Sequence, residues 1–200
     1  GNYYAALKDG NNNSIRTSTV VINEIRPSKP SILPEGPQQA CANSEIILSA
    51  NGNNTYTWYT EDNQALGTSN TLTATTSGSY KVRATNAFGC TSELSDAKSV
   101  TIHPEVAAPI VMNSGPFSVK AVVENITTPM TFEWYNDNVL LTNQQTELYK
   151  VAGLENGQSA HLTAKAHAVF TIPGTSNSIT CTSALSEAFT YTRNANEEIV

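Results

Sequence analysis

Three histidines and three cysteines are the side chains of this sequence best suited to bind a metal or to take part in catalysis. His161 and His167 are six positions apart on one expected strand, which places them on one face but roughly 20 Å from each other. Ligands of a single zinc ion must lie within about 2.1 Å of it. His103 falls in an expected linker. We therefore expect no metal site and no cofactor.

Cysteine chemistry is equally poorly supported. A cysteine nucleophile needs a nearby histidine and an orienting Asp or Asn side chain, and the pattern around Cys181 supplies neither. The positions of Cys41, Cys90 and Cys181 are far from the CxxC spacing of metal sites. The sequence also lacks the local motifs of serine hydrolases and zinc proteases. We predict that this chain is not an enzyme.

Two asparagine-rich runs, at 9–13 and 51–54, carry the oxygen ligands that calcium prefers. Neither run continues to the acidic residue that closes a calcium-binding loop. Asp-Gly and Asn-Gly, which open these runs, are also the usual dipeptides of tight hairpin turns. We interpret both runs as turns between strands.

The charge balance excludes two further classes of partner. Lys and Arg number 11 and the formal net charge is -6, so we expect no interface with a nucleic-acid backbone. No apolar run approaches the roughly 18 residues that cross a bilayer, so we expect no membrane insertion.

The elements that must position these side chains are strands, because apolar and polar residues alternate along the chain. Tyr56 and Trp58 share one face of their segment, and Tyr80 and Val82 share one face of another. No convincing helical period occurs in any long window. We predict an all-β fold, with Trp58, Tyr80 and Trp134 in its cores.

A tyrosine follows each tryptophan and faces the other way. Tyr59 and Tyr135 are therefore better candidates than the tryptophans for stacking on a sugar ring. An exposed tyrosine on a sheet is also common simply because aromatic residues favour strands. Both interpretations remain open at this point.

The sequence repeats itself. Residues 90–101 align without gaps on residues 181–192, and seven of these twelve positions are identical. Upstream, Tyr-Thr-Trp-Tyr at 56–59 matches Phe-Glu-Trp-Tyr at 132–135. A third, partial copy opens the chain, and joints that contain proline follow the first two copies.

Domain boundaries follow from these joints. We predict the last two strands of a truncated repeat, a complete repeat, a second complete repeat with a longer hairpin, and a tail that leads to a further C-terminal segment. Their expected ranges are 1–27, 28–104, 105–194 and 195–200 respectively.

The order of motifs in the first complete repeat is Cys41, an apolar strand, Trp58, a Gly-x-Tyr-x-Val strand through Tyr80, and Asn-x-x-Gly-Cys ending at Cys90. This order resembles the immunoglobulin-like repeats of secreted cell-surface proteins of Bacteroidetes-type bacteria, which are clients of type IX secretion. The resemblance implies tandem immunoglobulin-like β-sandwiches with a tryptophan in each core. It also implies a secreted or cell-surface location.

The resemblance further implies a structural disulfide between Cys41 and Cys90, because the family pattern pairs these two positions. Two buried thiols are the alternative. Cys181 has no partner within its own repeat, so we expect it to be a half-buried free thiol.

The second repeat carries an insertion near its end. The span from Tyr80 to Cys90 is about 10 residues, whereas the corresponding span that ends at Cys181 is about 19. The extra residues, with Phe170, Ile172 and Asn177 as candidates for ligand contact, lie where immunoglobulin-like domains often place recognition loops. A hairpin that is merely longer is the alternative.

Residues 1–25 are expected to form a hairpin without the rest of its domain. A lone two-stranded hairpin is only marginally stable in water. Its apolar face would consist of Tyr3, Ala5, Leu7, Val20 and Ile22. We therefore predict that this segment pairs with another chain or with an exposed strand edge, which would give a dimer that depends on residues 1–25.

Two functional hypotheses follow. The first is a non-catalytic spacer or adhesion region of an exported bacterial surface protein. The second is a glycan-binding accessory region of a secreted enzyme that degrades polysaccharides. The expected partners are surface polysaccharide or another surface protein, and fold-level analogy carries much of both hypotheses.

Overall fold

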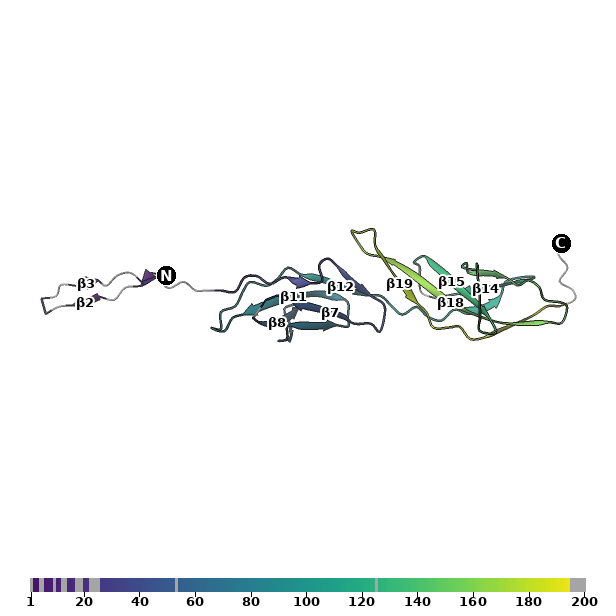
Figure 1. The fold of residues 1–200 in the computed structure, drawn as a ribbon, viewed down its shortest axis with the longest axis horizontal. Helices are drawn as coiled ribbons and strands as arrows, with labels where there is room; N and C mark the ends of the chain where they lie inside the picture. Colours follow the sequence, from purple (N-terminus) through teal and green to yellow (C-terminus); the bar gives the residue numbers. More distant parts are fainter. Residues whose placement is uncertain are drawn as a thin grey trace. The chain divides into compact units, whose positions relative to one another are not determined.

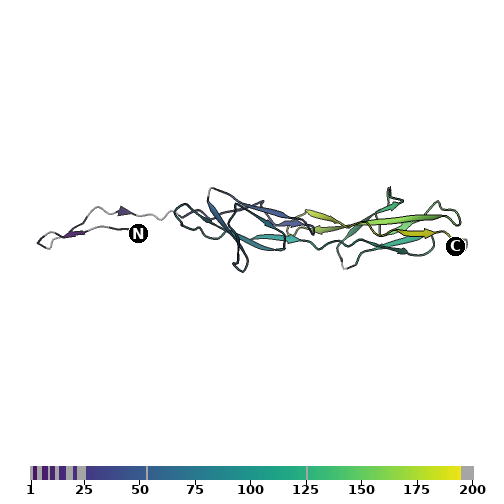
Figure 2. The same ribbon diagram turned by 90° about the horizontal axis from the view of Figure 1, so that it is seen from below.

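The structure is a computed structural model that describes residues 26–194 except 53 and 125, together with residues 2–3, 6–8, 10–11, 14–16 and 20–21. Every regular element in this part of the chain is a β-strand, and both views of the ribbon show strands and connecting segments only (Figure 1, Figure 2). The predicted all-β fold is confirmed. Among the described residues, no helix is long and apolar enough to cross a membrane.

The first sandwich has a three-stranded and a five-stranded sheet, and Figure 1 labels four of its strands. The smaller sheet has the order β10 (Thr71–Ala74), β7 (Ile46–Ala50), β5 (Ile32–Leu33). The larger has the order β6 (Gln38–Ala40), β12 (Lys98–Ile102), β11 (Gly78–Thr85), β8 (Thr55–Thr60), β9 (Ala65–Gly67). Strand β6 pairs in parallel with β12, whereas β8 is antiparallel to both β11 and β9.

The second sandwich repeats this plan. Its smaller sheet has the order β13 (Ile110–Asn113), β14 (Ser118–Val122), β17 (Leu148–Lys150). Its larger sheet has the order β16 (Val139–Leu141), β15 (Met130–Asn136), β18 (Ser159–Thr171), β19 (Ser178–Thr182). Strand β20 (Phe189–Thr192) pairs with the first part of β18.

Alternation fixes which side chains fill the cores, because successive strand residues point to opposite faces. Trp58 and Trp134 are both 0% exposed, and Tyr80 is also buried. Each indole nitrogen donates a hydrogen bond to a backbone carbonyl, of Ser69 at 2.8 Å and of Thr146 at 2.9 Å. The two tryptophans therefore have all their polar and apolar surface occupied by the fold.

The N-terminal segment is described only in part. Strand β1 (Asn2–Tyr3) is antiparallel to β4 (Val20–Val21), and β2 (Ala6–Lys8) is antiparallel to β3 (Ser14–Arg16). The side chains of the expected apolar face lie outside the described part of the chain. Residues 5 and 22 lie outside it entirely, as does the tail at 195–200. The dimer through residues 1–25 stays a prediction.

The chain divides into two compact units whose limits differ from the repeat boundaries expected from the sequence. One contains residues 1–36, 47–73 and 78–99, and the other contains residues 37–46, 74–77 and 100–200. Residues 37–46 group with residues 100–200, with which they share the β6–β12 strand pair and a covalent bond described below.

Candidate functional site

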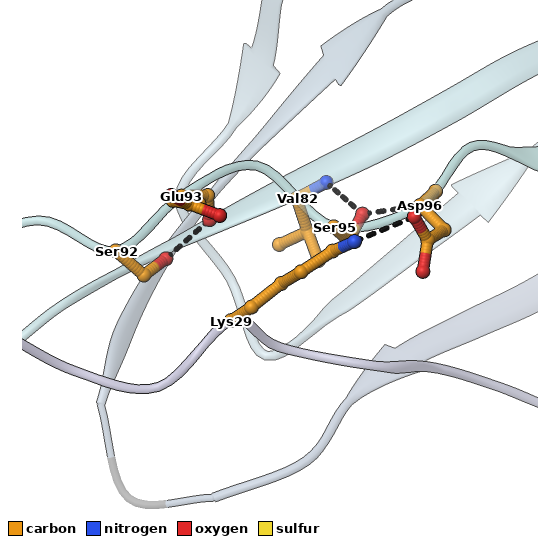
Figure 3. A network of polar contacts seen from close by, with 6 residues as sticks. All are labelled: Lys29, Val82, Ser92, Glu93, Ser95 and Asp96. Carbon is orange, nitrogen blue, oxygen red and sulfur yellow. Dashed lines mark hydrogen bonds and ion pairs between the residues drawn. The ribbon is translucent and has the colours of Figure 1, made fainter.

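Two serines of the repeated motif complete the edge of the β11 ladder with their side chains (Figure 3). The amide of Val82 donates to Ser95 Oγ at 2.9 Å, and the amide of Ser95 donates to the Val82 carbonyl at 2.8 Å. The Ser95 hydroxyl in turn donates to the Asp96 carbonyl at 2.9 Å. In the same way, Ser92 Oγ accepts from the Ala84 amide and donates to the Glu93 carbonyl. Lys29 Nζ lies 2.5 Å from Asp96 Oδ1, an exposed ion pair that adds little stability.

The second sandwich has the same pair of serines in the same role. The amides of Ala164 and Ala166 donate to the hydroxyls of Ser186 and Ser183, each at 2.9 Å. These buried hydroxyls again donate to the carbonyl of the next residue. The most strongly repeated motif in the sequence therefore supports the fold rather than a ligand.

Tyr59 and Tyr135 lie on the outer faces of the larger sheets, opposite the buried tryptophans. The Arg83 guanidinium lies 6.0 Å from the centre of the Tyr59 ring, and the Lys165 ammonium lies 6.0 Å from the centre of the Tyr135 ring. Both contacts are within the range of cation–π attraction. A sugar ring stacked on the same face of either tyrosine would compete with this cation.

A polar array specific to the second sandwich surrounds Tyr135. The Tyr135 hydroxyl donates to Glu133 Oε2 at 2.7 Å, and His167 Nε2 lies 3.5 Å from Glu133 Oε1. His167 Nδ1 is 2.9 Å from Thr182 Oγ1. The first sandwich has Thr57 at the position of Glu133, so it lacks the carboxylate on which this array is built.

The array shifts two ionisation equilibria. The hydrogen bond from Tyr135 is the main cause that holds the pKa of Glu133 below its ordinary value, and the interactions of Glu133 with His167 and Lys165 act in the same direction. The same hydrogen bond is the main cause that raises the pKa of Tyr135. The array therefore contains an ionised carboxylate and a protonated phenol at neutral pH.

The histidines are placed apart, as their spacing predicts. His161 pairs with Thr190 in the strand register and its Nδ1 lies 3.1 Å from Thr190 Oγ1, whereas His167 pairs with Thr182. Within the described part of the chain, no group of three or more His, Cys, Asp or Glu side chains could hold a metal ion.

The second asparagine-rich run forms hydrogen bonds within the protein. The Asn51 carbonyl accepts from the Tyr56 hydroxyl at 2.5 Å, and Asn51 Oδ1 accepts from the Ser31 amide at 3.3 Å. Gly52 has a φ of +112°, a conformation that favours glycine in a turn. Residue 53 and most of the run at 9–13 lie outside the described residues.

The long hairpin of the second repeat consists of the end of β18, a turn, and β19. Phe170 pairs with Ile179, and beyond the last strand pair the Ile172 amide donates to the Asn177 carbonyl at 2.9 Å. The Asn177 amide donates to Thr175 Oγ1 at 3.1 Å, so the turn is stabilised internally. Of the three candidate contact residues, Asn177 is exposed, whereas Phe170 and Ile172 are half-buried.

Phe170 has a partner within its own compact unit. Its ring stacks on that of His103 with centroids 3.9 Å apart and an interplanar angle of 15°. His103 Nε2 also lies 2.6 Å from Gln39 Oε1. Burial lowers the pKa of His103 below its ordinary value of 6.5, so the ring is neutral at neutral pH. The base of the hairpin therefore packs on a residue expected to be a free linker.

A disulfide lies in the same unit and joins Cys41 to Cys181 across 140 residues of sequence, with a Cα–Cα distance of 5.5 Å. Cys181 is 2% exposed and belongs to β19, while Cys41 directly follows β6. Cys90 is a half-buried free thiol. The predicted Cys41–Cys90 bridge is wrong, and so is the expected free thiol at Cys181.

Strand geometry explains this correction. Cys41 follows Ala40, which pairs with Ile102, and Ile102 is hydrogen-bonded to the Ser77 hydroxyl just before β11 begins. The Cys90 amide donates a hydrogen bond to Asn86 Oδ1, and Asn86 directly follows the end of β11. An eight-residue strand therefore separates the two cysteines by roughly 20 Å, three times the Cα–Cα distance that a disulfide allows.

A cavity of about 520 Å³ opens beside β17 and β20 in the second sandwich. The Arg193 guanidinium lies 5.1 Å from the Phe117 ring centre and donates to the Leu154 carbonyl, and the Tyr191 hydroxyl accepts from the Phe117 amide at 3.1 Å. Its lining residues include no carboxylate, histidine or cysteine. The cavity offers apolar surface together with the side chains of Lys150, Tyr191 and Arg193.

Sequence reasoning missed the Cys41–Cys181 bond and the His103–Phe170 stack. The repeat alignment leaves the bond as one of two open pairings. Cys90 and Cys181 occupy equivalent positions, and the second repeat has no counterpart of Cys41. This equivalence leaves Cys41 two candidate partners, Cys90 in its own repeat and Cys181 in the next.

The comparison with protein families agrees with this geometry. Residues 27–104 match the family described as "Ig-like domain CHU_C associated", which supports an immunoglobulin-like domain of Bacteroidetes-type proteins. This segment has an immunoglobulin-like β-sandwich fold. The first complete repeat that we expected from the sequence, 28–104, has nearly the same limits. No curated protein matches the chain.

The solved structures to which this chain is similar share little sequence with it. Fibronectin(III)-like modules of Clostridium thermocellum CbhA are 12% identical over 86% of this chain and 97% of theirs, with a TM-score of 0.41. The CD2-binding domain of CD58 is 14% identical over 80% of this chain and 98% of its own, with a TM-score of 0.40. Three N-terminal domains of the bacteriophage RB49 Hoc protein are 16% identical over 78% of this chain and 57% of theirs, with a TM-score of 0.36.

Proposed function

We propose that this chain is a non-catalytic spacer region of an exported surface protein, in which a disulfide braces successive immunoglobulin-like repeats. The observation that carries the proposal is the Cys41–Cys181 bond, which covalently links a residue of segment 27–104 to a strand of the second sandwich. The His103–Phe170 stack adds a noncovalent contact from the joint itself. A spacer needs restricted joints more than it needs a binding cleft.

The disulfide also favours the export that this proposal includes. Disulfides form and persist in oxidising compartments and are rare in the cytosol. The described residues hold one bridge and one half-buried thiol, and the outer faces of the sheets are occupied by their own cation–π and hydrogen-bonded contacts. These features favour secretion or surface display and a role that does not involve turnover of a substrate.

Backbone 15N relaxation of the oxidised chain and of a Cys41→Ser/Cys181→Ser variant would test the spacer. We expect the two sandwiches to share one rotational correlation time in the oxidised chain and to show two shorter ones in the variant. Cys90→Ser, which leaves the bridge intact, is the matched control. Independent tumbling of the two sandwiches in the oxidised chain would refute the proposal.

Glycan contact through the hairpin is the second candidate, as adhesion or as an accessory role beside a polysaccharide-degrading enzyme. The observation in its favour is that residues 173–178 at the tip are all exposed while the turn is stabilised by its own hydrogen bonds. A glycan array should then show binding that Asn177→Ala weakens and Asn138→Ala, in the turn between β15 and β16, does not. Equal signals from both variants would exclude the tip.

A further inference from the structure

Cys90 and Cys181 occupy equivalent positions in the two sandwiches. Thr91, the residue after Cys90, pairs with Thr85, and Thr182, the residue after Cys181, pairs with His167. The serine that follows each threonine accepts a backbone amide of the neighbouring strand in the same way. The two cysteines are therefore the same structural element, seen once as a thiol and once in a disulfide.

The disulfide of Cys181 indicates which cysteine position this equivalent position bonds to. Cys41 directly follows β6, the strand that pairs in parallel with the last strand of the first sandwich. The bond thus runs from the β18–β19 end of one repeat to the β6 end of the repeat that precedes it in sequence. Applied one repeat earlier, the same rule gives Cys90 a partner at the β6 end of a repeat N-terminal to residue 28.

The surroundings of Cys90 agree with a missing partner. Phe88, two residues before Cys90, is 85% exposed. In the second sandwich the hairpin beside Cys181 carries Phe170, which is covered by the His103 ring. An exposed aromatic side chain beside a reachable thiol matches the covered aromatic beside the bonded one.

We infer that Cys90 is a cross-linking site for the cysteine that follows the β6-equivalent strand of a preceding immunoglobulin-like repeat. The chain itself cannot supply this thiol, because it has three cysteines and the other two are bonded to each other. A second copy cannot supply it either, since its Cys41 is bonded to its own Cys181. The inference rests on the observed bridge and the repeat equivalence, and is independent of the proposed spacer role.

The bond forms by two thiol–disulfide exchanges with a small disulfide such as oxidised glutathione. The Cys90 thiolate attacks one sulfur, which gives a mixed disulfide and releases one reduced thiol. The partner thiolate then attacks the Cys90 sulfur and releases the second reduced thiol. Two protein thiols are oxidised by two electrons in total, and one small disulfide is reduced to two thiols.

The intact, folded chain provides the first test. Incubation with oxidised glutathione should add one glutathione per chain on Cys90, reversible by dithiothreitol, while Cys41–Cys181 stays bonded. Cys90→Ser should add none. A wild-type chain that acquires no adduct until it is denatured would overturn the inference, because the site would then be closed to any partner.

The second test supplies the missing partner. In a chain that carries a second copy of residues 28–104 ahead of Ser28, with serine at the Cys90 position of the added copy, peptide mapping should find the added Cys41-position thiol bonded to Cys90. The same chain with serine at the added Cys41 position should keep Cys90 as a thiol. A free Cys90 in the first of these chains, after folding under oxidising conditions, would refute the inference.

Discussion

Serine occupies two equivalent positions in each repeat, where its hydroxyl both accepts and donates a hydrogen bond. At Ser92, Ser95, Ser183 and Ser186 the oxygen accepts a strand amide while its hydrogen bonds the next carbonyl. The regular backbone hydrogen bonds between strands can therefore stop here without leaving a buried N–H group unpaired. An unpaired buried N–H group would cost about 1–3 kcal/mol. These serines are among the positions that are identical in the two repeats.

Replacing Ser95 by alanine should destabilise the protein, because the Val82 amide would lose its acceptor in a buried site. We expect a loss of about 1–3 kcal/mol in the free energy of unfolding, measured by urea denaturation. Ser99→Ala, at an exposed position of β12, is the matched control and should change it by less than about 0.5 kcal/mol. Equal losses from the two variants would contradict the role given to the hydroxyl.

The ionisation of Glu133 depends on a single hydroxyl. Tyr135→Phe removes the hydrogen bond that contributes most to the low pKa of Glu133, so that pKa should rise towards its ordinary value. A low carboxylate pKa stabilises the fold above that ordinary value and the contribution is lost as pH falls through the folded pKa. The variant should therefore show a weaker loss of stability in acid.

A carboxyl 13C NMR titration of Glu133 would measure this pKa directly. Tyr59→Phe is the matched control, because Tyr59 lies on the equivalent strand and has Thr57 where Tyr135 has the carboxylate. A pKa of Glu133 that is unchanged in Tyr135→Phe would show that the interactions with His167 and Lys165 dominate instead.

At the scale of elements, the long hairpin has two parts with different tasks. Its base carries Phe170 and Cys181, which contact His103 and Cys41. Its tip, at residues 173–178, is exposed. The serine hydrogen bonds span 8 residues in the first sandwich and 17 in the second, so the insertion adds nine residues between equivalent points. These extra residues give the strand pair the length at which it carries an aromatic side chain to His103.

Phe170→Ala should uncover the His103 ring, and the pKa of His103 should then rise towards 6.5, because its lowered value comes from burial. A histidine with a lowered pKa stabilises the fold above its ordinary pKa and loses that contribution as pH falls through the folded value. Imidazole NMR titration measures the shift. Ile172→Ala, which removes another half-buried side chain of the hairpin, should leave the titration unchanged.

Across the whole molecule, alternation and internal repetition were enough to predict the all-β fold and the burial of Trp58 and Trp134. Both are properties of local sequence, because strand period and core position follow from neighbouring residues. The pairing of Cys41 could not be read in this way. It depends on which end of a strand each cysteine reaches, and the family pattern placed Cys90 beside Cys41 when β11 holds them apart.

The sequence likewise could not distinguish ligand contact by Phe170 from packing within the fold. A half-buried aromatic in a long loop is compatible with ligand contact or with packing, and only the position of His103 distinguishes the two. For Asn177 the question remains one for binding experiments, because the structure leaves its side chain at an exposed turn.

The central claim is that one disulfide links segment 27–104 to the second sandwich. Peptide mapping of the oxidised chain without reduction, after its remaining thiol has been alkylated, tests it most directly. We predict a linked pair of peptides that contain Cys41 and Cys181, and alkylation of Cys90 alone. A Cys41–Cys90 pair, or three alkylated cysteines in the folded protein, would contradict the account.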